Sequence, residues 1–257
     1  MVYEPIIFGG PFNEHYGHFL CESIARLWYS LKDHRYAILC RGLSERRVWG
    51  KTFLDAFIEG MPIDRRRFIS FDNAVILRTA IVPHPSFTIR CEGFEVHKVC
   101  TENVAEQLLD GRERRTAQPL YLSRSRLNRK LRKVTNEVVL ERALIDRNIA
   151  ICHPETKSLK EQVNLVNKHD VVIGTLGSAL HAVLFDVSRE KNLICLGFKD
   201  LFVNSNYLLI DAIKSVNSVY VGALDKDPSC CVEERWKQAG IVDVNLVLAV
   251  LHDQALI

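Results

Sequence analysis

A glycine-containing turn between a predicted strand and a predicted helix is the segment best suited to bind an anion. The apolar run 171–173 leads into Gly174-Thr175-Leu176-Gly177-Ser178, which we call the glycine turn, and a helix is expected over 178–185. Such a turn presents backbone N–H groups at a helix N-terminus, where the orphan donors and the helix dipole favour negative charge. An ordinary turn with no ligand is the alternative.

Positive charge is concentrated just before this turn. Residues 112–133 contain nine Lys and Arg residues against one acid, a net charge of +8, whereas the whole chain carries +3. Arginine offers planar forks of donors that match phosphate. Arg124 is the best candidate because it follows a predicted strand at the carboxyl edge, where α/β proteins bind ligands. Arg132 is the second candidate, the remaining basic residues are expected on a solvated surface, and the expected ligand carries phosphate.

Four further polar residues extend this candidate ligand site. Glu155 follows a predicted strand, so its carboxylate can accept hydrogen bonds from ribose or sugar hydroxyls. Asn136 lies in the first turn of a predicted helix, a place that such residues also favour without function. Ser178 could contact phosphate or only cap its helix. His181 lies one turn further and could equally be a core or surface histidine.

His18 and Glu22 are the candidate catalytic pair of the N-terminal part. They are four residues apart on a predicted helix and therefore share one face. Histidine has an unperturbed pKa of about 6.5, which suits a general base, and a neighbouring carboxylate orients the imidazole. A surface ion pair or a structural histidine is the alternative, and His15 is a lesser candidate for the base.

The elements that must position these residues alternate between strand and helix, which predicts an α/β fold with a mostly parallel sheet. A polar stretch over 111–118, ending at Pro119, is the predicted linker. It divides the chain into domains over 1–111 and 119–230, followed by C-terminal helices over 231–257. Strands are predicted over 6–8, 37–40, 68–71, 74–77, 80–82, 120–123, 149–152, 171–173, 193–196 and 219–221, and helices over 17–33, 44–59, 95–109, 136–147, 158–168, 178–185, 232–238 and 244–252.

The composition fits a soluble globular protein, with 47% hydrophobic and 25% charged residues among 257. No window approaches the roughly 18 apolar residues of a membrane span. The first residues lack the features of a secretory signal. The eight cysteines form no C-x-x-C pair, which fits reduced, buried thiols. We therefore expect a cytoplasmic protein, and the absence of a Gly-x-Gly-x-x-Gly fingerprint disfavours an NAD enzyme.

Four motifs follow one another along the chain. They are an arginine after a strand, an Asn-Glu pair that begins a helix, a Glu followed by a Ser-x-x-Glu-Gln helix, and a Gly-x-x-Gly-small-small-Leu turn. They are Tyr121-Leu122-Ser123-Arg124, Arg132, Asn136-Glu137, Glu155, Ser158, Glu161-Gln162 and residues 173–180, preceded by Gly17-His18-Phe19-Leu20, Glu22-Ser23 and Ala25-Arg26-Leu27-Trp28. Together they resemble glycosyltransferase family 61, and the stretch 13–28 resembles its bacterial branch of capsular polysaccharide biosynthesis. The chain departs from the family at the turn, where Thr175-Leu176-Gly177-Ser178 stands in place of the usual His-Gly-Ala-Gly.

The resemblance implies a GT-B fold, in which two Rossmann-like halves face each other across a cleft. The C-terminal half would bind a nucleotide-sugar donor and the N-terminal half a saccharide or lipid-linked saccharide acceptor. The implied reaction is inverting and metal-independent, with no cofactor, in capsular or exopolysaccharide biosynthesis. Asp225-Lys226-Asp227 resembles a manganese-binding Asp-x-Asp motif, but turn chemistry explains it better. The chain is short for such an enzyme, so a reduced acceptor half is expected.

Other functions stay open at this stage. A nucleotide-sugar epimerase would use the same diphosphate pocket without an acceptor groove, and a non-catalytic nucleotide-sugar or glycan-binding protein could keep the fold with an altered turn. A nucleic-acid partner is not expected, because the basic segment has no interleaved aromatic residues beyond Tyr121. Peripheral contact of the basic residues with the inner membrane surface is a further possibility.

Overall fold

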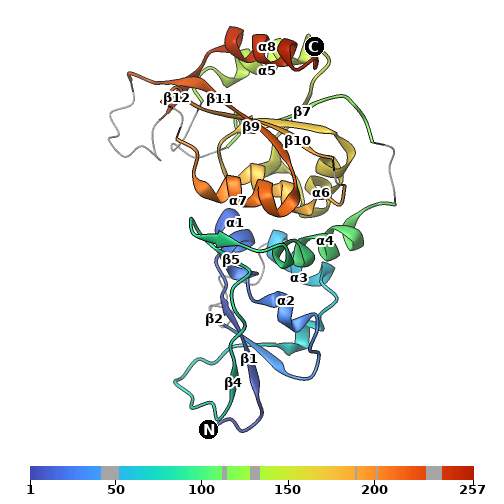
Figure 1. Cartoon of the computed structure of the whole chain (residues 1–257), viewed down its shortest axis with the longest axis vertical. Coiled ribbons are helices and arrows are strands. Elements are labelled where there is room, and N and C mark those ends of the chain that lie inside the picture. Colours follow the sequence, from blue (N-terminus) through green and yellow to red (C-terminus); the bar gives the residue numbers. More distant parts are fainter. Residues whose placement is uncertain (42–51, 112–114, 128–133, 189, 201, 230–238) are drawn as a thin grey trace.

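The computed structural model describes residues 1–41, 52–111, 115–127, 134–188, 190–200, 202–229 and 239–257. Within these residues the chain forms two α/β lobes that follow one another in sequence, with helices between their two sheets (Figure 1). The N-terminal lobe holds a four-stranded sheet and the C-terminal lobe a six-stranded sheet. The predicted α/β class is confirmed.

In the N-terminal lobe all strand pairs of the sheet are parallel, in the order β3-β2-β1-β4. The chain passes outward from β1 to β3 and then returns to place β4 on the other side of β1, so the topological switch point lies between β1 and β4. The elements are β1 (Ile6–Pro11), α1 (Tyr16–His18), the π-helical turn η1 (Phe19–Ser23), α2 (Leu27–Ser30), β2 (Ala37–Arg41), α3 (Thr52–Gly60), the 3₁₀ turn η2 (Arg65–Arg67), β3 (Phe68–Ile69), β4 (Ala80–Ile81), a hairpin of β5 (Phe87–Thr88) and β6 (Glu92–Gly93), and α4 (Val96–Leu108).

The C-terminal sheet has the order β12-β11-β10-β9-β7-β8, with only β12 antiparallel among the described strands. Its switch point lies between β7 and β9, the place where such sheets bind ligands beyond the carboxyl ends of their strands. The elements are β7 (Leu120–Leu122), α5 (Glu137–Ile145), β8 (Ala150–Cys152), η3 (Pro154–Thr156), α6 (Leu159–Lys168), β9 (Val171–Thr175), the 3₁₀ helix η4 (Ser178–Phe185), β10 (Asn192–Phe198), α7 (Ser205–Lys214), β11 (Asn217–Lys226), β12 (Gly240–Val242) and α8 (Val244–Asp253).

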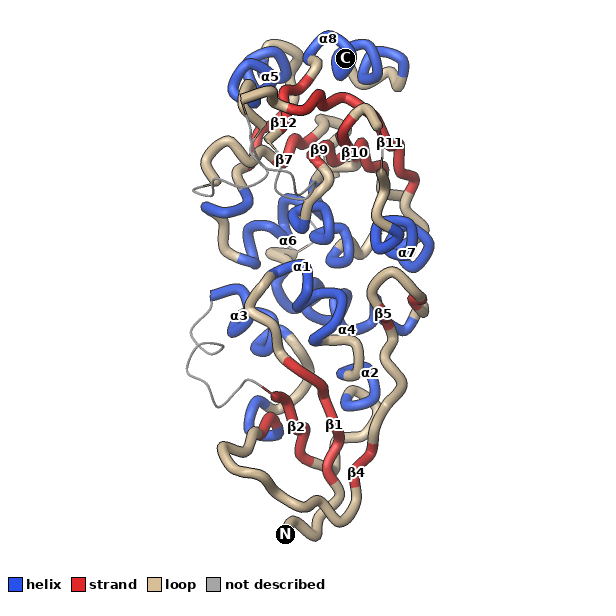
Figure 2. The backbone as a smooth tube through the Cα atoms, turned by 90° about the vertical axis from the view of Figure 1, so that its left-hand side faces the viewer, coloured by secondary structure: helices blue, strands red, loops and turns tan. Residues whose placement is uncertain are grey.

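One hydrophobic core runs through both lobes. Helices α1, α3 and α4 of the first lobe face α6 and α7 of the second (Figure 2). The rings of Phe57 and Phe185 meet at 6.0 Å across this seam, and Thr101 Oγ1 donates to the carbonyl of Leu184. A second apolar cluster lies on the other face of the C-terminal sheet, beneath α5 and α8.

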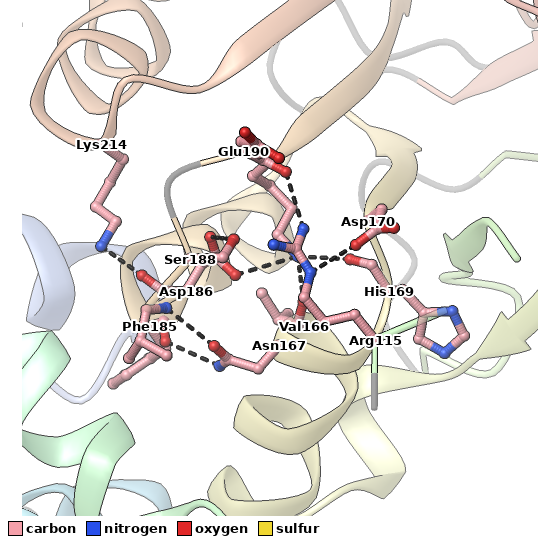
Figure 3. Close-up of polar contacts among 12 residues, drawn as sticks. Arg115, Val166, Asn167, His169, Asp170, Phe185, Asp186, Ser188, Glu190 and Lys214 are labelled. Carbon is pink, nitrogen blue, oxygen red and sulfur yellow. Dashed lines mark hydrogen bonds and ion pairs between the residues drawn. The ribbon is translucent and has the colours of Figure 1, made fainter. Parts of the chain in front are cut away.

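A buried ion pair fixes the end of η4. Lys191 and Asp186 are both 1% exposed, with 3.1 Å between Nζ and Oδ1. Lys191 also donates to the carbonyls of Val166 and His169 at the end of α6. Lys214 on α7 donates to the carbonyl of Asp186 (Figure 3). The group ties η4 to the helices on both sides of it.

Several local predictions differ from the structure. Residues 74–77 form no strand, and Leu77 makes only an isolated bridge with Val2. The helix predicted over 17–33 is divided, because the amide of Ile24 bonds to the carbonyl of Phe19 five residues back and shifts the helical register. Helix α7 was not predicted, and β12 is a strand of the C-terminal sheet within a region where only helices were expected.

Some predictions cannot be followed, since the helix over 232–238 and the first part, 44–51, of the helix predicted over 44–59 lie outside the described residues. In the part of the chain that is described, no helix has both the length and the apolar character needed to cross a bilayer.

Candidate functional site

Three polar side chains are accessible to solvent in an otherwise buried segment after β1. From Gly17 to Leu27 every residue is buried except His18, Glu22 and Arg26, which we call the polar row. His18 and Glu22 share one face, and Arg26 follows four residues further, after the π-helical turn. The segment includes the π-helical turn η1, a conformation found frequently at functional sites.

His18 and Glu22 make the side-chain contact that their spacing predicts. His18 Nδ1 lies 2.5 Å from Glu22 Oε2, and the two side chains are 50% and 43% exposed. When Nδ1–H donates to this carboxylate, Nε2 carries the lone pair that can accept a proton from a hydroxyl. The ring of His15 packs edge-on against His18 at 5.1 Å. The pair therefore has the geometry of an oriented, accessible base.

Gly17 brings this pair to the glycine turn of the other lobe. A Cβ on Gly17 would lie 2.9 Å from Cβ of Ser178 and 3.2 Å from Nδ1 of His181. Real Cβ atoms do not approach other atoms so closely without displacement, so only glycine fits here. The segment that carries the candidate base and the start of η4 are thus in contact across the seam.

Arg124 lies against the same turn. A Cβ on Gly177 would lie 3.3 Å from Nη1 of Arg124. Arg124 follows β7 and the glycine turn begins in the last two residues of β9, so the two meet at the switch point of the C-terminal sheet. A guanidinium group and the N–H groups at the start of η4 therefore occupy one place, as an anion site requires.

A buried carboxylate holds the loop that carries Arg124. Glu137, 1% exposed, accepts hydrogen bonds from the Tyr121 hydroxyl at 2.8 Å and from the Arg124 amide at 2.9 Å. Burial raises the pKa of Glu137, and its hydrogen bonds and the Arg124 charge oppose that shift. Ser123 and Ser125 donate to the next carboxylate along α5, that of Glu141. The backbone of Arg124 is therefore fixed by α5.

His181 is buried at the seam, 7% exposed. Its Nδ1 lies 3.8 Å from Sγ of Cys21, and its ring lies 5.3 Å from that of Tyr207. Burial lowers the pKa of His181 to about 4, with smaller contributions from His15 and His18. At neutral pH this imidazole is therefore uncharged and can offer a hydrogen bond but no positive charge. Its Nε2, like Thr175 Oγ1, is buried and has no hydrogen-bond partner among the described residues.

The remaining predicted site residues have other surroundings. Asn136 exchanges two hydrogen bonds of 2.8 Å with the backbone of Val242, so its amide serves the packing of β12. Glu155 is exposed in η3, at the carboxyl end of β8. Gly174 lies inside β9 beneath Leu180, and Arg132 lies outside the described residues.

Two further alternatives from the sequence concern Ser178 and the stretch from Asp225 to Asp227. Ser178 does not cap η4, because Gly177 occupies the N-cap position, and that interpretation is wrong. Asp225 lies within β11 and pairs with Lys199 at 2.8 Å, while Asp227, just after the strand, accepts from Thr135 and Ser229. Among the described residues no group of three or more His, Cys, Asp or Glu side chains is arranged to hold a metal ion.

Four residues of this site were not predicted from the sequence. Gly17 and Arg26 were noticed only as part of the resemblance, although Arg26 repeats the spacing of four set by His18 and Glu22. Cys21 gave no chemical signal, since it reads as an ordinary core thiol. Tyr207 had none either, because α7 itself was not predicted.

The fold and site define an α/β protein with two doubly wound sheets and its polar site at a switch point. A comparison with models of protein families matches residues 16–195 to Glycosyltransferase 61. This match covers well over half of the chain, including His18 and the glycine turn. The chain belongs to glycosyltransferase family 61 and is therefore a glycosyltransferase. A comparison with curated proteins finds no match.

Proposed function

We propose that this glycosyltransferase moves a sugar from a nucleotide-sugar donor to a saccharide hydroxyl, with inversion and without a metal ion. The observation that carries the proposal is the contact of Gly17 with Ser178 and His181. This contact brings the segment that carries His18 against the glycine turn, where the nucleotide sugar is proposed to bind. In this proposal the lobes act as the halves of a GT-B enzyme, with the donor held by the C-terminal lobe and the acceptor by the N-terminal lobe.

His18 is the general base of the proposed reaction. The acceptor hydroxyl gives its proton to His18 Nε2 while its oxygen bonds to the anomeric carbon. The bond from that carbon to the diphosphate oxygen breaks on the opposite face, so one displacement inverts the configuration. Glu22, 2.5 Å from His18 Nδ1, stabilises the imidazolium that forms.

Fixed donors stabilise the leaving diphosphate. Arg124 provides a guanidinium fork and the N–H groups after Gly177 provide backbone donors, aimed where negative charge develops. Arg132 is proposed as a second guanidinium. Thr175 and His181 add neutral hydrogen bonds from their buried, unpartnered atoms.

Two residues act around the donor. Glu155 is proposed to accept hydrogen bonds from ribose or sugar hydroxyls, because it is exposed at the carboxyl end of the strand beside β7. Asn136 is proposed to support the site through its two bonds to β12.

We place the reaction in capsular or exopolysaccharide assembly in the cytoplasm, with a free or lipid-linked acceptor at the inner membrane surface. The resemblance of residues 13–28 to the bacterial branch of the family supports the pathway. The basic segment 112–133 supports attraction to an acidic membrane. No nucleic-acid partner and no cofactor are proposed.

The test begins with calorimetry against UDP, GDP and CMP, followed by turnover of the matching nucleotide sugars with glycan acceptors. His18→Ala is expected to abolish transfer and leave the Kd of the nucleotide unchanged. His252→Ala, which removes an exposed imidazole in α8, is the matched control and keeps full activity. Retained turnover in His18→Ala would overturn the assignment of the base.

The same assay separates the other functions. Conversion of the nucleotide sugar into a new one without acceptor would indicate an epimerase, and nucleotide binding with no reaction would indicate a binding protein. Activity lost to a chelator and restored by manganese would overturn the metal-independent mechanism.

A further inference from the structure

The carboxyl end of β1 has the features of a ligand site in the N-terminal lobe. It lies at the switch point between β1 and β4, the counterpart of the place that Arg124 occupies in the other lobe. The pairing of β1 with β2 shifts register between Phe8 and Gly10. Gly10 has a φ of +96°, which glycine adopts without strain. A bulge of this kind redirects the chain and is common beside active sites.

Arg26 occupies this end of the strand. Its guanidinium carbon lies 5.6 Å from the centre of the Phe8 ring. Its Nη1 is 3.5 Å from where a Cβ of Gly10 would be, so glycine leaves the guanidinium room against the backbone. Its Nε is buried and has no hydrogen-bond partner within the described residues.

Two other arginines of this lobe have carboxylate or carbonyl partners. Arg35 pairs with Asp33 through two hydrogen bonds, and Arg67 donates to three backbone carbonyls. No ion pair among the described residues joins Arg26 to a carboxylate, and Glu22 directs its own carboxylate to His18. A buried donor without a partner is costly and rare in folded proteins. Arg26 therefore has an N–H donor without a partner and a positive charge that no carboxylate of the described residues pairs with.

Arg26 also belongs to the polar row. His18, Glu22 and Arg26 are the residues of that segment that solvent reaches. A ligand bound at Arg26 would therefore lie on the solvent side of the same short segment that carries the proposed base. A guanidinium fork recognises carboxylate and phosphate groups with two parallel hydrogen bonds.

We propose that Arg26, at the bulged end of β1, binds an anionic group of the acceptor, so that the acceptor is an acidic rather than a neutral saccharide. The inference rests on the proposed function, since it assigns the acceptor to this lobe. The shared chemistry is an anionic oxygen group, which a uronate carboxylate or a sugar phosphate can supply.

The test uses glucuronate, glucose 6-phosphate and glucose as probes of the UDP-saturated protein, or of the protein saturated with whichever nucleotide binds. Titrations are followed by the NMR signal of Arg26 Nε–H, assigned by its loss in Arg26→Lys. The acidic probes are expected to shift this signal and to bind about tenfold or more tightly than glucose. The tighter of the two acidic probes identifies the source of the anion.

Variants provide the controls. Arg26→Gln is expected to reduce the affinity for acidic probes to that for glucose, and Arg26→Lys to give an intermediate value, because an ammonium keeps the charge but not the fork. Arg78→Gln removes the same charge at the amino-terminal ends of the parallel strands, away from Arg26. This variant is expected to leave the affinity for the acidic probes unchanged. Equal binding of acidic and neutral probes, or undiminished binding by a folded Arg26→Gln, would overturn the inference.

The nucleotide titration separates this inference from the proposed function. If no nucleotide binds at Arg124 while the acidic probes still shift Arg26, the donor assignment fails and the anion site stands. If nucleotide binding and transfer are normal and unchanged in Arg26→Gln, the anion site alone fails.

Discussion

Glu137 is the buried carboxylate on which the position of Arg124 depends. Glu137→Ala leaves the Tyr121 hydroxyl and the Arg124 amide without their acceptor. A buried polar group left without its partner costs about 1–3 kcal/mol. We expect a loss of this order in the free energy of unfolding, measured in urea, together with weaker nucleotide binding. Glu137→Gln keeps one oxygen acceptor and should lose less, and equal values for the two variants would contradict this role.

His97 gives the protein a predictable sensitivity to acid. It is buried between the Ser86 hydroxyl and the Leu20 carbonyl, each 2.9 Å from one ring nitrogen, and burial lowers its pKa to about 4. In the unfolded chain the value is about 6.5, so between these values the unfolded state binds more protons. The stability is therefore complete above about pH 6.5 and falls toward about pH 4, by roughly 3 kcal/mol at about 1.4 kcal/mol per pKa unit.

Urea unfolding at about pH 7.5 and about pH 5 measures this dependence. His97→Gln should be less stable at the higher pH but lose less on acidification, while the exposed His252→Gln should follow the parent protein. An unchanged pH dependence in His97→Gln would show that the acid sensitivity comes from elsewhere. His181, also with its pKa lowered to about 4 by burial, adds to the effect in every variant.

At the scale of elements, the packing of α1 on η4 depends on glycine at position 17, which has no side chain. Gly17→Ala places a methyl group 2.9 Å from Cβ of Ser178 and should force the two elements apart. We expect transfer to fall far more than the nucleotide affinity, because Arg124 is held by α5. Ser178→Gly in the same chain removes the opposing Cβ and should restore part of the melting temperature. A double-mutant cycle of the two substitutions measures this coupling, and strictly additive effects would contradict the contact.

Elements with local signals were predicted well. Ser158 and Glu161 form a capping box at the start of α6, which the Ser-x-x-Glu spacing encodes locally, and the pair of His18 and Glu22 follows from helical spacing. Helix α7 was missed because its apolar residues are almost continuous and show no clear periodicity. The meeting of Gly17 with Ser178 depends on how two lobes pack, and no spacing along the chain encodes it. The hydrogen bonds between Asn136 and Val242 of β12 were not predicted for the same reason.

At the scale of the whole molecule, the shared core predicts that the lobes unfold together. Phe57 packs on Phe185, and Lys214 of α7 pairs with Glu102 of α4 at 2.5 Å. We expect urea unfolding followed by tryptophan fluorescence and by circular dichroism to give one coincident transition. Two separated transitions would show that each lobe is stable alone.

The same shared core should delay the folding of the N-terminal lobe during synthesis of the chain. A ribosome delivers the N-terminal lobe first, and domains usually fold as they emerge. Here the apolar side chains of α3 and α4 lack their cover until η4 and Phe185 have left the exit tunnel. The nascent first lobe should therefore stay open to proteases and chaperones until most of the second lobe is made, and pulse proteolysis of stalled chains can follow that delay.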